Sequence, residues 1–360
     1  MNSIILMLAA IANVCSMDIV LGPGERLEFP AGSLNYGSWR VLKGGTPECP
    51  AVITTAAGEG GVARLCNPLF TNDFGRVLDI RASNVIVERL HFENGVTPPP
   101  DKKEYPNGIG PQHWNVPQLA AVLIETNATN VIVRDCEFSA CPIGVRVRGT
   151  DSAVVSNRFH GAHKITERWG AIAIAITGSR TELAYNEIRD YGYLGGVFGS
   201  DGAAFEIDSE DPSSQGREIA DVDIHDNRVQ NVQGGFIEVT RGDVRRIRIA
   251  DNFSDCQDKF GGFADLSSEV TIERNVIWHR RLPLTALFWG AVTDSVFRDN
   301  RVVFREGARF DRQALQRKGC SLDFKRSGNV YSSTAESAAE FFRGEGLKAD
   351  ERYIQVSHDR

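Results

Sequence analysis

The sequence predicts an all-β protein whose strands stack as the coils of a solenoid. Two observations support this prediction. A short pattern of alternating apolar and polar residues recurs along most of the chain, and an asparagine returns at nearly the same place in successive copies. Strict alternation is typical of strands that bury one side in a core. Recurrence every 20 to 50 residues or so is typical of stacked repeats, so we expect one elongated domain.

Each copy of the repeat reads as a strand, a polar turn and a second short strand. Two clear copies are NVIVERLHFENG at 84–95 and NVIVRDCEFSAC at 130–141. Asn tolerates positive φ and its side-chain amide can bond the next coil, so we expect the turn asparagines to adopt positive φ and to stack as a ladder. These asparagines are Asn157, Asn186, Asn227, Asn252, Asn275, Asn300 and Asn329.

With these repeats the chain resembles the right-handed parallel β-helix family, the fold of pectate lyases, polygalacturonases, alginate lyases and epimerases. The resemblance covers roughly residues 76–330 and implies about nine or more coils. It implies a carbohydrate-active protein, although the family also contains tailspikes and adhesins. The polygalacturonase motifs Asn-Thr-Asp, Asp-Asp, Gly-His-Gly and Arg-Ile-Lys are absent, as is the pectate lyase motif Arg-x-Pro-x-x-Arg. The resemblance therefore assigns no catalytic residue.

The N-terminal segment predicts export. An apolar run at 4–14 is too short to span a bilayer and ends among small residues, so we expect residues 1–16 to be a signal peptide. A buried first strand is the alternative. The protein is then secreted or periplasmic, where the close pairs Cys49/Cys66 and Cys136/Cys141 are disulfide candidates. Unpaired core thiols are the alternative for these cysteines.

The rest of the chain is expected to form one β-helix domain at 17–334. A long loop is inserted at 94–117 and a smaller one at 209–218. The segment 335–360 is expected to cap the open end of the solenoid with a short helix.

Composition excludes several classes of partner. Lys+Arg 40 against Asp+Glu 47 gives a net charge of 40 − 47 = −7, without the excess of cations that nucleic acid binding requires. A hydrophobic content of 42% allows a large core and excludes a disordered chain. No apolar run reaches the roughly 20 residues of a transmembrane helix, so we expect no membrane span.

The alternation also predicts which side chains share the outer face of the strand that precedes each repeat. With the apolar residues inward and coils about 4.8 Å apart, the acidic residues Glu206, Glu238 and Asp265 fall into one column. Asp208 lies beside this column, and Asp201 enters from the preceding turn. Carboxylates held close together raise the pKa of one another or bind a cation, although a solvated strand face is the alternative. The predicted outward positions are Asp79, Leu123, Arg146, Ala175, Glu206, Glu238 and Asp265.

Candidate substrate-binding residues flank the column. An outward aromatic ring, Trp289 or Phe288 depending on register, can stack on a sugar ring, and arginines can bind anionic substituents. The long loop can form a groove wall. The alternatives are core packing for the aromatic ring, surface charge for the arginines and a disordered flap for the loop. The candidates are Trp289, Arg146, Arg148, Arg241, His113 and Trp114.

These residues favour a polysaccharide-degrading enzyme that works by acid/base hydrolysis without a cofactor. Its catalytic carboxyls would come from Glu206, Glu238, Asp265 and Asp208, with Glu238 as the proton donor. One alternative is a uronate lyase, and a non-catalytic glycan-binding or tailspike-like protein is the alternative of a different class. In the lyase, Asp201, Glu206, Glu238 and Asp265 would hold Ca²⁺ while Arg241, Lys259 or a loop lysine such as Lys102 or Lys103 removes a proton.

Overall fold

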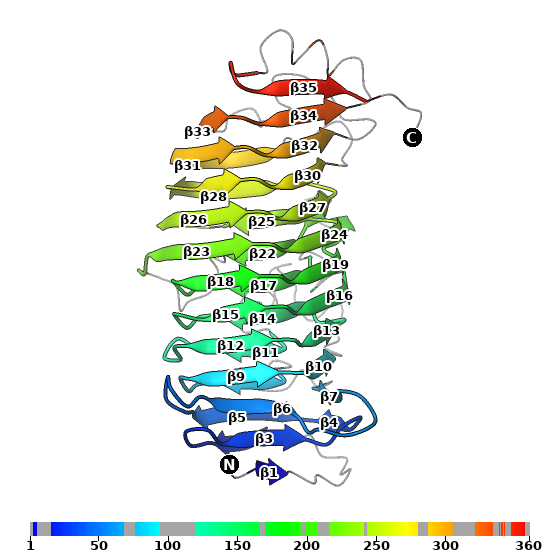
Figure 1. Ribbon diagram of the computed structural model, residues 1–360, viewed down its shortest axis with the longest axis vertical. Coiled ribbons are helices and arrows are strands. Elements are labelled where there is room, and N and C mark those ends of the chain that lie inside the picture. The colour runs from blue at the N-terminus through cyan, green and yellow to red at the C-terminus, as the bar shows by residue number, and fades with distance from the viewer. Residues whose placement is uncertain are drawn as a thin grey trace, which may run out of the picture.

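The computed structural model describes residues 3–5, 16–67, 76–93, 120–163, 165, 170–195, 199–207, 216–240, 243–279, 287–304, 321–333, 338, 340, 342 and 347–356. These residues form a stack of parallel strands that runs from β1 at one end to β35 at the other (Figure 1). Each full coil contributes one strand to each of three faces, and equivalent strands of neighbouring coils pair in parallel. The predicted all-β parallel β-helix is confirmed.

The first face carries the column of outward residues that includes Glu206 and Glu238. Its strands are β2 (Ser16–Val20), β5 (Ser38–Lys43), β8 (Leu78–Ile80), β11 (Val122–Ile124), β14 (Ile143–Val147), β17 (Ile172–Ile176), β22 (Ala203–Ile207), β25 (Gly235–Val239), β28 (Gly261–Ser268) and the first half of β31 (Phe288–Arg298).

The second face follows the first along the chain. Its strands are β1 (Ser3–Ile5), β3 (Arg26–Phe29), β6 (Ala51–Thr55), β9 (Val85–Glu88), β12 (Val131–Arg134), β15 (Ala153–Val155), β18 (Thr181–Ala184), β23 (Ile219–His225), β26 (Val244–Ala250), β29 (Thr271–Glu273), the second half of β31 and β33 (Ser321–Ser327).

The third face completes each coil. Its strands are β4 (Leu34–Tyr36), β7 (Ala63–Cys66), β10 (Leu90–Glu93), β13 (Glu137–Ser139), β16 (Arg158–Ala162), β19 (Glu187–Tyr191), β24 (Arg228–Val232), β27 (Phe253–Cys256), β30 (Val276–His279), β32 (Arg301–Phe304), β34 (Val330–Ser333) and β35 (Arg352–Gln355). One antiparallel hairpin, β20 (Tyr193–Gly195) with β21 (Gly199–Asp201), stands between β19 and β22.

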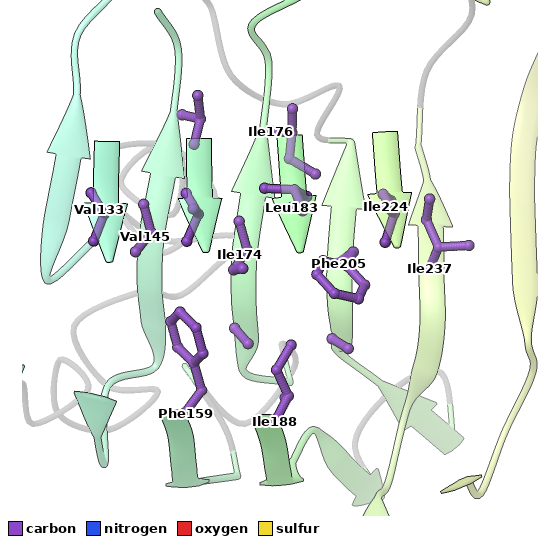
Figure 2. Close-up of a cluster of buried hydrophobic side chains, with 14 of the residues drawn as sticks. Val133, Val145, Phe159, Ile174, Ile176, Leu183, Ile188, Phe205, Ile224 and Ile237 are labelled. Carbon is purple, nitrogen blue, oxygen red and sulfur yellow. The ribbon is translucent and has the colours of Figure 1, made fainter. Parts of the chain in front are cut away.

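The core fills the space between the three faces with side chains that repeat from coil to coil. Figure 2 shows part of it, where Ile174 of β17, Phe205 of β22 and Ile237 of β25 occupy register positions in successive coils. All three are fully buried. On the third face, the rings of Phe138 and Phe159 stack with centroids 4.5 Å apart. Each such buried side chain contributes roughly 1.5–3 kcal/mol, which explains why the apolar alternation predicts the fold.

The asparagine ladder is present and buried, but its backbone differs from the prediction. In every step the Oδ1 atom of one Asn accepts hydrogen bonds from the backbone N–H and the side-chain amide of the Asn in the preceding coil. The expectation of positive φ at these asparagines is wrong, because the preceding residue takes that conformation, as Asp251 does with φ 59°. The ladder joins Asn157, Asn186, Asn227, Asn252, Asn275, Asn300 and Asn329.

At the two ends of the β-helix, one further expectation is wrong and another stays a prediction. No helical cap is seen among the described elements, and residues 352–355 instead pair with β34 and extend the third face. Phe342 closes the core there by stacking on Tyr331 and Tyr353. At the other end, Ser3–Ile5 pair with β3. The signal peptide stays a prediction.

The disulfide expectation is wrong for the cysteines that the structure describes. Cys49 and Cys136 carry free thiols, so neither the Cys49/Cys66 nor the Cys136/Cys141 disulfide forms. Cys136 and Cys141 instead lie in the core, where each thiol faces a carbonyl oxygen of the preceding coil. Within the described ranges, the chain forms no helix with the length and apolar character that crossing a bilayer requires.

Candidate functional site

The outward column of the first face holds two adjacent carboxylates, but not the third that was expected. Glu206 of β22 is the register partner of Glu238 of β25, so their backbones lie about 4.8 Å apart. The register partner of Glu238 in the next coil is Gly262, not Asp265. The prediction failed because β28 begins with two glycines, which leave no alternation to read. Asp265 lies further along, between the parts of β28 that belong to the first and second faces.

A buried lysine is paired with one of these carboxylates. The Nζ atom of Lys259 lies 3.2 Å from Oε2 of Glu238 and 3.0 Å from Oδ2 of Asp258. Burial by itself lowers the pKa of Lys259, but the carboxylates of Glu238 and Asp258 outweigh it and raise the pKa above its ordinary value. Lys259 is therefore an ammonium group that stabilises the negative charge of Glu238. In this state it is not the base that a lyase requires.

A second carboxyl group next to Glu238 has the opposite character. Asp201 ends the β20–β21 hairpin, and its Oδ2 atom accepts a hydrogen bond of 2.7 Å from the backbone N–H of Gly170. Burial, assisted by the negative charge of Glu238, raises the pKa of Asp201 to about 6, against the opposing effects of the Gly170 N–H and of Lys259. Asp201 thus keeps its proton well above the pH at which an ordinary aspartate loses it.

The local backbone explains why Asp201 is held in this place. Gly202, which follows it, has φ 85°, and a Cβ there would lie 2.4 Å from the carbonyl oxygen of Ala171. Only glycine allows the chain to turn so tightly from the hairpin into β22. The sequence placed Asp201 near the column, but only the burial produced by this turn gives the residue its proton.

Trp289 occupies the next position of the column. It is the register partner of Gly262 and is partly exposed, whereas Phe288 is buried in the core. The Nζ atom of Lys259 lies 5.7 Å from the centroid of the indole ring. Of the two registers considered, the one with Trp289 outward is therefore observed.

No protein-family model and no curated protein matches the sequence. Solved structures do match. A double mutant of the tailspike protein of E. coli bacteriophage HK620 aligns with a TM-score of 0.51 and 12% identity, over 94% of this chain and 60% of that chain. The chain has the right-handed parallel β-helix fold.

Two carbohydrate-active enzymes are also similar. Alginate lyase from a Paenibacillus species has a TM-score of 0.46 and 9% identity, over 95% of this chain and 96% of that chain. Lacto-N-biosidase from Eubacterium ramulus has a TM-score of 0.46 and 12% identity, over 94% and 62%. At these identities the similarity concerns the β-helix fold.

Two of the arginines predicted to bind substrate, Arg146 and Arg148, are buried. Arg146 precedes Ala175 and Glu206 in the register, as expected, but none of its surface is exposed. Arg148 is 5% exposed, and its guanidinium lies 3.1 Å from the carboxylate of Glu125. Both side chains are covered by protein, so neither belongs to the site built around Glu238.

Several predicted site residues lie outside the described part of the β-helix. Within that part, no group of three or more His, Cys, Asp or Glu side chains is placed to hold a metal ion, and the Ca²⁺ site stays a prediction. Asp258 was missed by the sequence reasoning, although an acid directly before Lys259 is a usable signal. The residues outside the description are Asp208, Arg241, His113, Trp114, Lys102 and Lys103, and for Asp265 only the backbone is described.

Proposed function

We propose that the protein hydrolyses glycosidic bonds in a polysaccharide or oligosaccharide that binds along the first face of the β-helix. The observation that carries this proposal is a pair of carboxyl groups in opposite environments. Asp201 keeps its proton up to a pKa of about 6, while the carboxylate of Glu238 lies 3.2 Å from the Lys259 ammonium. Two carboxyls whose surroundings separate their protonation states are what acid/base glycosidases use.

The roles follow from these two environments. Asp201 donates its proton to the glycosidic oxygen as the leaving group departs, and Glu238 acts at the anomeric carbon as a base toward water or as a nucleophile. Glu206 adds negative charge beside Glu238, which stabilises the positive charge that develops on the sugar ring. Trp289 offers an aromatic surface next to the pair. The proton donor is thus Asp201, in place of the Glu238 expected from the sequence.

A degradation assay with two site variants tests the proposal. Asp201→Asn and Glu238→Gln should each lower kcat/KM by about 10²–10⁴-fold on the glycan that the wild type cleaves, because each removes one half of the acid/base pair. The new amides keep the size of the carboxyl groups, so circular dichroism should show intact folding. Matched controls are Asp190→Asn and Glu187→Gln on β19, which carry the same chemical change on the third face and should leave kcat/KM unchanged.

The products separate the alternatives. Release of reducing ends without ultraviolet absorbance from an unsaturated uronate supports hydrolysis. Unsaturated products, especially if a chelator abolishes them, would establish the Ca²⁺-dependent lyase instead. If a panel of neutral, amino-sugar and anionic glycans yields no product at all, the protein is a non-catalytic glycan-binding or tailspike-like module.

The pH dependence is a further expected outcome. Asp201 acts as an acid only while it is protonated, so kcat/KM should fall as the pH rises through about 6, the raised pKa of this group. A pH profile of kcat/KM between pH 4 and 9 checks this. An alkaline limb that persists unchanged in the residual activity of Asp201→Asn would contradict the assignment.

A further inference from the structure

Lys259 reaches Glu238 along a path that two glycines leave open. Its side chain starts in the turn before β28, and its stem passes Gly235 of β25 and Gly262 of β28. A Cβ atom on Gly235 would lie 3.1 Å from Cγ of Lys259, and one on Gly262 would lie 2.8 Å from its Cε. Two neighbouring coils therefore lack a side chain where the stem of the lysine crosses them.

The indole of Trp289 occupies the same gap. A Cβ atom on Gly262 would lie 2.5 Å from Nε1 and 2.7 Å from Cε2 of Trp289, so the edge of the indole rests on the backbone of β28. The lysine side chain beside this ring is only 7% exposed. Because Gly262 has no side chain, the indole of Trp289 can lie over the side chain of Lys259.

The charges around Glu238 show why the position of Lys259 matters. The described ionisable groups that face it are Glu206 from β22, Asp201 from β21, and Asp258 with Lys259 from the turn before β28. Lys259 is the cation among these described groups. If its ammonium moved away, Glu238 would face carboxyl groups from both neighbouring coils without this counter-ion.

We propose that Gly262 is a positioning residue of the site, which holds Lys259 beneath the indole of Trp289 and against the carboxylate of Glu238. A side chain at this position displaces both neighbours and releases the negative charge of Glu238 from its counter-ion. The consequence for turnover rests on the proposed hydrolytic function. The placement of Lys259 does not, and it can be tested without a substrate.

Lysine acylation followed by mass spectrometry tests the placement. In the wild type, Lys259 should react with an amine-acylating reagent at least about tenfold more slowly than the exposed Lys43, because burial limits its reaction to transient openings. In Gly262→Ala and in Trp289→Ala, Lys259 should react nearly as fast as Lys43. Gly58→Ala is the matched control, since its new Cβ meets only Ala31 at an ordinary 3.4 Å, and it should keep Lys259 protected.

The outcomes are distinct. Rapid acylation of Lys259 in the wild type, or continued protection in both variants, would overturn the proposal. If Gly262→Ala does not fold, Trp289→Ala, which changes an outward side chain, decides the point.

A pH profile then tests the link to Glu238. The pH dependence of kcat/KM should differ between Gly262→Ala and the wild type, and an unchanged profile would overturn that link. Absence of turnover in the wild type would remove the proposed function and leave the acylation result standing.

Discussion

At the scale of single residues, Asp201 couples the proposed chemistry to the stability of the protein. Its pKa is about 6 in the folded state, against an ordinary 3.8, because the folded environment disfavours the charged form. The stabilisation that comes from holding a proton is complete below about pH 4 and is lost as the pH rises through about 6. Relative to Asp201→Asn, the wild type should lose at most about 3 kcal/mol of unfolding free energy across this interval.

Urea denaturation of both proteins at half-unit pH steps from 4 to 7 measures this difference. A difference between the two proteins that stays constant over the interval would show that Asp201 ionises as it does in the unfolded chain. Asp190→Asn on β19 is the control, and it should follow the wild type.

The sequence predicted the members of the column correctly only in strands where apolar and polar side chains alternate. Glu206 and Glu238 were placed correctly because apolar neighbours on both sides fix the register of β22 and β25. Asp265 was misplaced because glycines begin β28. The proton on Asp201 and the ion pair of Lys259 depend on burial by other coils, which no local pattern records.

At the scale of the elements, the asparagine ladder fixes the turn between the second and third faces. Asn252 accepts bonds of 2.9 Å and 3.0 Å from the backbone and side-chain amides of Asn227, and it donates to the carbonyl of Ile224 at 2.9 Å. Asn252→Ala would leave these buried groups without partners, at about 1–3 kcal/mol for each. We therefore expect a loss of several kcal/mol in unfolding free energy, measured by chemical denaturation.

The matched control is Asn127→Ala, which removes one exposed bond to the carbonyl of Arg81 and should cost less than about 1 kcal/mol. Equal effects of the two substitutions would show that the ladder adds nothing beyond a surface hydrogen bond. The ladder itself was predictable from the recurrence of Asn. Its backbone was not, because a residue such as Asp251 before the Asn takes the positive φ and varies in type from coil to coil.

At the scale of the whole molecule, one continuous core joins the coils. A single cluster of buried side chains extends from Ile19 in the first described coil to Phe342 near the last. The repeat predicted this continuous core, since each coil must bury its apolar face against the next. The ends were less predictable because they lie outside the repeat, which is why the strand at 352–355, within the predicted capping segment, was not expected.

The free thiols of the core test whether this continuity makes the β-helix unfold as one unit. Cys136 and Cys256 are buried in coils far apart along the axis, whereas Cys49 is exposed. With Cys15 and Cys320 replaced by Ser, a thiol reagent should label Cys49 at once. It should label Cys136 and Cys256 together, at one denaturant concentration, because an uninterrupted core couples neighbouring coils. Labelling of Cys136 and Cys256 at clearly different denaturant concentrations, followed by mass spectrometry, would show that the two ends of the helix open independently.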